Sequence, residues 1–380
     1  MITNSITLSI QGDFVDSFIY SGTLFIVHAN SQLSTYSWKK ILECATDQIS
    51  NTNLKRQISS FMKDCKVLPF DFKNIEPISI EIDNETLEEI KVSTIYLTGW
   101  PSDINVYSDC LYICGEEGVD EYDFDWKTNK IIDSPPFKIW NQYAFMISPN
   151  NFHRLAIAAG KNGVITAFPN LKNKSISSKD LSPLIDCPSS DCEWIGNNLV
   201  SNTSEGAYLS VFSSLPKTPQ NPDQEYWNLL NQAKRSEPET YPLENENYIN
   251  LKYAWMAGEK LLGINRQGEI YTHIETSSPD SQIQHKERHI SRLTQERFLA
   301  ARAGSFGTVI EYENELILYN ESGEQLVAKR PVNWRVFPRA KNYINHLHVV
   351  ENDSLKIYAF DIKQSNHHVD YYAIDINNII

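Results

Sequence analysis

The recurrence of one short unit along the chain constrains the fold more than any other feature. Residues 16–38 and 104–126 both follow the same order: a strand, a tight turn, a very apolar strand, a polar turn, and an alternating strand that ends in Trp. Five further stretches follow this order less regularly. They are residues 144–168, 194–212, 253–274, 297–319 and 343–360.

Seven such units, each of about four short antiparallel strands, are typical of a β-propeller. A lone four-stranded sheet cannot bury both of its faces, whereas sheets stacked radially cover one another. We therefore predict an all-β fold, with residues 1–380 forming a single seven-bladed β-propeller domain of four-stranded antiparallel blades. Two β-sandwich domains would need a linker near the middle of the chain, and a β-solenoid would need a shorter and stricter period. Both remain as alternatives.

Two stretches interrupt the repeat and predict partly helical insertions. Residues 43–74 contain apolar side chains close to helical spacing. Residues 217–247 form a Pro-rich acidic insertion, in which residues 223–235 predict a short amphipathic helix that carries Tyr226 and Trp227. Without these insertions the chain averages about 45 residues per unit, close to the length of a WD-type blade. A helix in either insertion would dock a partner or cover an edge of the propeller.

A sequence feature near residue 126 resembles the WD-repeat class of propellers. Asp125-Trp126-Lys127-Thr128-Asn129 is similar to the Trp-Asp pair and turn that close a strand in that class, with the order of the pair inverted. The other units lack this signature, so the chain resembles a degenerate WD-repeat protein. The resemblance implies propeller geometry over nearly the whole chain.

The charge balance narrows the range of partners. The chain has 34 basic and 48 acidic residues, for a net charge of −14. This balance argues against broad non-specific binding to DNA or to anionic membranes. The first basic residue is Lys39, and no apolar run reaches the roughly 18 residues needed to span a bilayer. We expect a cytoplasmic protein that binds no membrane, with the nucleus as the alternative location.

One basic segment stands out against this acidic background. Residues 329–341 contain five Lys and Arg residues and no acid, with Trp334 and Phe337 between them. Arginine and aromatic side chains together can grip an acidic protein, a phosphate or a base. Alternatively, the arginines neutralise nearby acidic blades while the aromatic residues pack in the core. The predicted partner-binding residues are Lys329, Arg330, Trp334, Arg335, Arg339, Lys341, Tyr226 and Trp227.

Evidence for an enzyme is weaker. His346 and His348 alternate on a strand and so point the same way, and a metal-dependent hydrolase or lyase would need them to face a central channel with carboxylates from other blades. Glu121, Asp123 and Asp125 share one strand face, which an amphipathic outer strand explains. The sequence contains no nucleophile elbow, phosphate-binding loop or dinucleotide fingerprint.

These observations favour a non-catalytic propeller scaffold that binds one or more proteins, as a subunit of a larger complex. We expect no catalytic residue, no metal, no cofactor and no small-molecule substrate. An enzyme with its site on the central axis is the alternative. A nucleic-acid-binding subunit that uses residues 329–341 is the second alternative.

Overall fold

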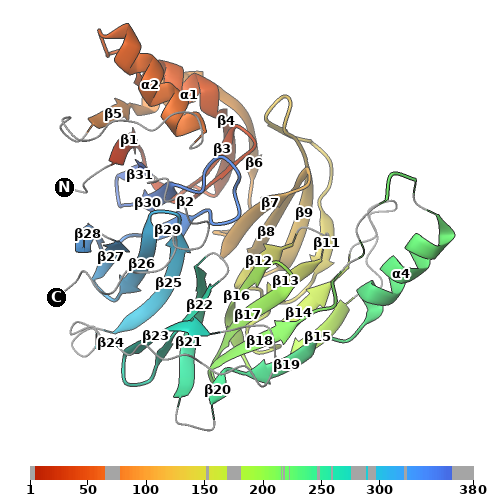
Figure 1. The fold of residues 1–380 in the computed structure, drawn as a ribbon. Coiled ribbons are helices and arrows are strands. Elements are labelled where there is room, and N and C mark those ends of the chain that lie inside the picture. Colours follow the sequence, from red (N-terminus) through yellow and green to blue (C-terminus); the bar gives the residue numbers. More distant parts are fainter. Residues whose placement is uncertain are drawn as a thin grey trace.

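The strands form seven small sheets arranged in a ring, which confirms the predicted propeller (Figure 1). The computed structural model describes residues 5–64, 78–150, 154–168, 181–214, 216, 219–221, 223–245, 249–257, 260–274, 288–289, 297–320 and 323–361. We number the sheets as blades 1–7 in chain order. No helix within these ranges is long and apolar enough to cross a membrane.

The first four blades follow one another directly along the chain. Blade 1 contains β2 (Phe14–Tyr20), β3 (Thr23–His28), β4 (Gln32–Ser37) and β6 (Lys91–Tyr96). Blade 2 contains β7 (Asp103–Tyr107), β8 (Cys110–Gly115) and β9 (Gly118–Asp125), with β10 (Lys130–Ile131) and β11 (Phe137–Trp140) both paired to β9. Blade 3 contains β12 (Met146–Pro149), β13 (Leu155–Ala158), β14 (Val164–Ala167) and β15 (Leu181–Ile185). Blade 4 contains β16 (Ser189–Ile195), β17 (Asn198–Thr203), β18 (Ala207–Val211) and β19 (Glu239–Pro242).

The last three blades complete the ring. Blade 5 contains β20 (Glu244–Asn245), β21 (Ile249–Ala257), β22 (Lys260–Asn265), β23 (Glu269–Ile274) and β24 (Arg288–His289). Blade 6 contains β25 (Phe298–Gly304), β26 (Gly307–Tyr312), β27 (Glu315–Asn320) and β28 (Gly323–Lys329). Blade 7 contains β29 (Asn333–Val336), β30 (His346–Val350), β31 (Ser354–Phe360), β1 (Ser5–Gln11) and β5 (Ile78–Ile82).

Both ends of the described chain meet in blade 7. Strand β1 pairs antiparallel with β31, from Ser5 opposite Phe360 to Gln11 opposite Ser354. Strand β5 then pairs with β1 in parallel. The sequence repeat did not reveal this closure, because β1 lies before the first recognisable unit. Pairing of β1 with β31 therefore closes the ring.

Apolar side chains on both faces of the middle strands hold neighbouring blades together. In β3, residues 24–27 are completely buried. Phe25 and Val27 pack in one cluster with Ile104 and Leu111 of blade 2. This burial on both faces explains why these strands read as continuous apolar runs.

The first insertion packs against the propeller. Helix α1 (Trp38–Ala45), helix α2 (Thr52–Lys63), strand β5 and helix α3 (Asn84–Glu89) all lie between β4 and β6, so the inserted segment is longer than residues 43–74. The sequence pattern placed Trp38 at the end of a strand, but Trp38 is the first residue of α1. Its indole is fully buried, and its Nε1 donates to the Met62 carbonyl over 2.9 Å. Ile58, Phe61 and Met62 are the buried face of α2.

The second insertion contains helix α4 (Gln224–Arg235) between β18 and β19. Asp223 caps the helix, since its carboxylate accepts a hydrogen bond from the Tyr226 amide over 2.8 Å. The helix projects from the ring (Figure 1), and none of its side chains whose burial is described is buried.

Candidate functional site

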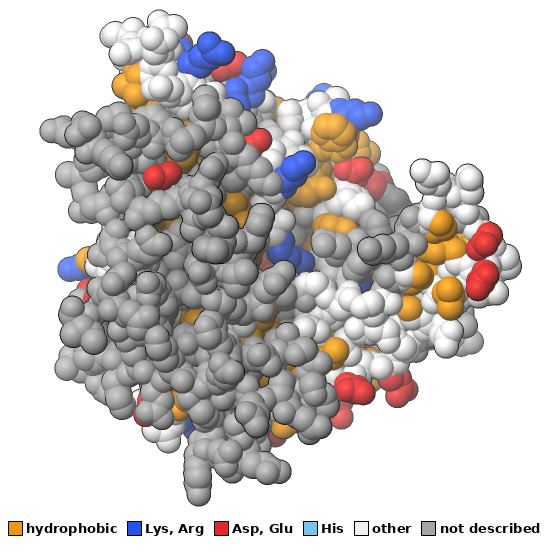
Figure 2. Space-filling view, in the orientation of Figure 1, with side chains coloured by type: hydrophobic (Ala, Val, Ile, Leu, Met, Phe, Trp, Pro, Cys, Tyr) orange, Lys and Arg blue, Asp and Glu red, His pale blue; other side chains and the backbone are white. Residues whose placement is uncertain are grey.

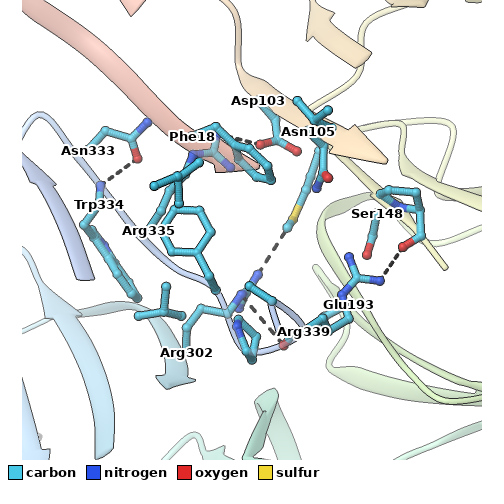
Figure 3. Close-up of a pocket in the computed structure, with 18 of the residues that line it drawn as sticks. Phe18, Asp103, Asn105, Ser148, Glu193, Arg302, Asn333, Trp334, Arg335 and Arg339 are labelled. Atoms are coloured by element: carbon cyan, nitrogen blue, oxygen red, sulfur yellow. Dashed lines mark hydrogen bonds and ion pairs between the residues drawn. The ribbon is translucent and has the colours of Figure 1, made fainter. Parts of the chain in front are cut away.

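The innermost strands of the blades enclose a channel along the axis of the ring. Each of these strands contacts the innermost strand of the next blade, and β29 contacts β2 to complete the circle. A cavity of about 730 Å³ occupies the channel, with residues from all seven innermost strands in its wall. These strands are β2, β7, β12, β16, β21, β25 and β29. Figure 3 shows part of this wall and the charged side chains that point into it.

Arg335 joins three blades on one side of the channel. From β29, its Nε donates to Asp16 of β2 over 2.7 Å, and its Nη2 lies 2.7 Å from Asp103 of β7 and also contacts Asp16. The Arg335 side chain is 15% exposed, and both carboxylates are almost fully buried. Burial raises the pKa of Asp103 despite the nearby guanidinium. The guanidinium of Arg335 is therefore the positive charge that both Asp16 and Asp103 contact.

Arg302 forms the matching cluster on the other side. From β25, its guanidinium pairs with Asp191 of β16 and donates to the Tyr253 hydroxyl of β21 over 2.5 Å. The Tyr253 hydroxyl also donates to Asp191. Burial acts to raise the pKa of Asp191, but the Arg302 charge and these hydrogen bonds outweigh it, so the net shift is downward.

A second carboxylate near Arg302, that of Glu193, is less well compensated by positive charge. Glu193 lies next to this pair, with its Oε2 3.8 Å from the Arg302 Nε. Burial raises the pKa of Glu193, against the opposing effect of Arg302.

Arg339 and Trp334 complete the charged wall. Arg339 enters the channel from the connection between β29 and β30, and its Nη1 donates to the Pro149 carbonyl of β12. Arg339 lines the cavity and keeps exposed surface, while the surrounding protein lowers the pKa of its guanidinium and Glu193 opposes that shift. Trp334 donates from Nε1 to Glu311 over 2.8 Å. Burial raises the pKa of Glu311.

The other predicted residues lie apart from the channel wall or at its edge. Lys329 ends β28 opposite Glu315 and is exposed. Arg330 is exposed in the turn that follows, and its Nε donates to Asn314 over 2.9 Å. Lys341 is exposed and is one of the residues that line the cavity. The predicted basic segment therefore has two parts. The inward part, at the channel, is formed by Trp334, Arg335 and Arg339. The outward part is formed by the exposed residues Lys329, Arg330 and Lys341.

Tyr226 and Trp227 lie together on α4, far along the chain from the basic segment. Their rings meet edge to face at 5.1 Å. Trp227 is 47% exposed and Leu229 is 49% exposed. Figure 2 shows hydrophobic side chains along α4 on the surface of the molecule.

His346 and His348 do not face the channel. Both imidazoles are buried, and the Nδ1 of His348 lies 2.9 Å from the hydroxyl of Ser17 on β2 of blade 1. Burial lowers the pKa of His346 to about 3, so this side chain is neutral at pH 7. Within the described ranges, no group of three or more His, Cys, Asp or Glu side chains is arranged to hold a metal ion. The alternative of a metal-dependent enzyme required these two histidines to face the channel. Their buried position is not compatible with that requirement.

The sequence did not reveal the acidic partners of the arginines. Asp16, Asp103 and Asp191 come from three innermost strands, and Arg302 comes from a fourth. One signal was present: each is a charged residue within a repeat unit or at most three residues before it. Their convergence depends on closure of the ring.

The comparisons with known proteins agree with the observed architecture. No family model matches the chain, and no curated protein matches it by sequence. The structure is similar to that of BBS1N in complex with ARL6DN, with a TM-score of 0.50, 9% identity, and coverage of 95% of this chain and 97% of that one.

Two further solved structures show the same degree of similarity. A chain of the Mitotic Checkpoint Complex has a TM-score of 0.50 and 10% identity, with 94% of this chain and 91% of that one covered. Chaetomium thermophilum Raptor has a TM-score of 0.50 and 9% identity, with 96% of this chain and 29% of that one covered. These structural neighbours are WD40-type propellers. At such low identity the similarity shows the fold alone.

Proposed function

We propose that this seven-bladed propeller is a non-catalytic subunit of a protein complex and that α4 is one of its docking elements. The observation that carries the proposal is the exposure of α4. Five of its side chains are apolar, and none of them is buried: Tyr226, Trp227, Leu229, Leu230 and Ala233. A helix of this kind fits a hydrophobic groove on another protein, with its aromatic residues as anchors.

The channel supports a structural role for its charged residues. Three of the channel carboxylates, Asp16, Asp103 and Asp191, are paired with Arg335 or Arg302 and are not free to act on a substrate. These pairs connect innermost strands of different blades, so loss of one partner would leave an uncompensated buried charge between blades. Two of the similar structures, by their titles, are of complexes, namely BBS1N with ARL6DN and the Mitotic Checkpoint Complex. That similarity supports protein partners for this chain too.

The outward part of the basic segment is a second candidate contact. Lys329, Arg330 and Lys341 are exposed and could pair with an acidic protein. Trp334 and Arg335, in contrast, make their polar contacts within the propeller. The alternating basic and aromatic residues therefore do not form the continuous outer surface that nucleic-acid binding would require.

Affinity capture of the whole tagged chain from cells, followed by cross-linking and mass spectrometry, tests the proposal. We expect a stoichiometric protein partner whose recovery falls when Trp227 is replaced by Glu. The matched control is Trp126→Glu, because Trp126 is also about half exposed but lies in a turn of blade 2. If the wild-type chain recovers no stoichiometric partner, the proposed function is wrong. If both variants recover the partner equally, α4 is not the docking element.

A further inference from the structure

Two loops meet on the face of the ring at which the innermost strands begin, which we name the entry face. One loop connects β6 to β7 and the other connects β11 to β12. The Ser102 hydroxyl donates to the Ala144 carbonyl over 2.6 Å. The Ala144 amide in turn donates to the carbonyl of Gly115, the last residue of β8, over 3.1 Å. These contacts hold three segments of the entry face side by side.

Three aromatic side chains of these two loops are exposed. Trp100 is 62% exposed, and Tyr143 and Phe145 are each 40% exposed. We name these three residues the aromatic rim. Isolated apolar residues at a surface are ordinary, but a group of large aromatic residues on adjoining loops is typical of an interaction site. Phe145 also lines the channel, so the rim reaches its mouth.

Contacts with the loops hold the rim aromatics in place. The Trp100 indole donates from Nε1 to the Ala29 carbonyl over 2.8 Å, although its ring is mostly exposed. Tyr143 and Phe145 meet edge to face at 4.6 Å. Groups that are already oriented lose less conformational entropy when a partner binds. The rim is therefore prepared to contact a ligand.

Two carboxylates lie in the adjoining turn between β8 and β9, where the Lys138 ammonium donates to the Glu117 carbonyl over 3.2 Å and pairs with Asp120. Glu116 and Glu117 are exposed and directly follow Gly115, the residue whose carbonyl joins the two loops. Among the described residues, acids outnumber bases at the exposed turns of the entry face. The acids are Asp13, Glu116, Glu117, Asp186, Glu205, Glu313 and Asp353, and the bases are Lys161, Arg266, Arg297 and Arg330. Aromatic faces and carboxylates both attract cations.

We propose that the aromatic rim, together with Glu116 and Glu117, binds an Arg- or Lys-rich segment of a partner protein. In this arrangement, guanidinium or ammonium groups of the partner stack on Trp100 and Tyr143, and neighbouring cations pair with the two glutamates. The inference rests on the proposed function, since it names the chemistry of one partner of the scaffold. It differs from the acidic partner predicted from residues 329–341, because Arg335 of that segment is paired inside the channel.

The test uses the full chain and a fluorescent 12-residue peptide of alternating arginine and serine, with binding measured by anisotropy. We expect Trp100→Ala with Tyr143→Ala to weaken binding about tenfold, because the double change removes two exposed cation–π contacts. Glu116→Gln with Glu117→Gln is expected to weaken binding about threefold and to reduce its salt dependence. All four side chains are exposed, so these variants should keep the wild-type Tm.

Matched controls separate the rim from the general acidity of the chain. Trp126→Ala removes an exposed tryptophan from the opposite end of blade 2, and Glu205→Gln with Glu313→Gln removes two carboxylates from distant turns of the entry face. We expect these controls to bind within about twofold of the wild type. Equal binding of an alternating glutamate–serine peptide, or unchanged affinity after loss of Trp100 and Tyr143, would overturn the inference. If the rim variants fail to reduce peptide binding while the wild-type chain still recovers a partner from cells, the rim inference is wrong but the proposed function stands.

Discussion

The basic segment and α4 were both predicted to bind partners, but they occupy different environments. Arg335 is inside the channel, where it pairs with Asp16 and Asp103. Trp227 is about half exposed on a helix that projects from the ring. The comparison shows that an excess of charge in a sequence can be neutralised by distant parts of the same chain. An amphipathic helix, in contrast, must find enough apolar surface nearby to be covered.

A second helical segment sharpens this comparison. Helices α1 and α2 connect the third and fourth strands of blade 1, as α4 does in blade 4, so the three helices have corresponding positions in the fold. Trp38, Phe61 and other residues of α1 and α2 join one large hydrophobic cluster with blades 1 and 7. Helix α4 has no buried side chain among those described. Similar local sequence patterns therefore give helices that pack into the hydrophobic core in one insertion and a helix with an exposed apolar surface in the other.

The largest expected effect is that of Arg335→Glu. This change places a third carboxylate beside Asp16 and Asp103, in a part of the channel where both acids are almost fully buried. Removal of one partner from a buried ion pair already costs about 3–5 kcal/mol, and a reversed charge should cost more. We expect urea unfolding to show a severely destabilised or unfolded variant. Lys329→Glu, at an exposed position of the same segment, is the control and should change the unfolding free energy by less than about 0.5 kcal/mol.

Trp38→Ala and Trp227→Ala test the difference between the two insertions. Loss of the buried Trp38 side chain should lower the unfolding free energy by about 3–5 kcal/mol, because it leaves a cavity beside Met62. Loss of the exposed Trp227 side chain should change it by less than about 0.5 kcal/mol. Chemical denaturation of both variants gives the two values. Equal destabilisation would mean that α4 packs as firmly as α1.

The sequence predicted the propeller because each blade is encoded locally, by apolar runs separated by turns. It also predicted the helix α4, since the spacing of its apolar residues is a local pattern. It did not predict β1 or the pairing of Arg302 with Asp191, because these contacts join residues far apart in the chain. The same limit explains why the sequence left two interpretations of residues 329–341 open, a partner-binding surface and arginines that neutralise acidic blades. Which side chains meet on the axis is decided only when the ring closes.

The pH dependence of stability tests the channel cluster on the Arg302 side. The pKa of Asp191 is below its usual value, so its contribution is complete above the unfolded-state pKa of about 3.9 and is lost as the pH falls through the folded-state pKa. Asp103 and Glu193 act in the opposite direction, because burial raises their pKa values and protonation relieves that cost. We therefore compare urea midpoints of the wild type and Asp191→Asn between pH 6 and pH 3. The advantage of the wild type should shrink as the pH falls, and a constant difference would contradict the assignment.

The smallest effect concerns the N-caps of α2 and α4. The Asn51 side chain accepts hydrogen bonds from the amides of Asn53 and Leu54, and Asp223 accepts one from Tyr226. Replacement of either cap by Ala should cost its helix about 0.5–2 kcal/mol. Because α2 is part of the hydrophobic core, Asn51→Ala should lower the global unfolding free energy. Because α4 has no buried side chain among those described, Asp223→Ala should leave that value unchanged and raise only the amide hydrogen exchange of residues 224–235. A drop in global stability for Asp223→Ala would show that α4 unfolds together with the propeller, and its role as an independent docking helix would then lose its physical basis.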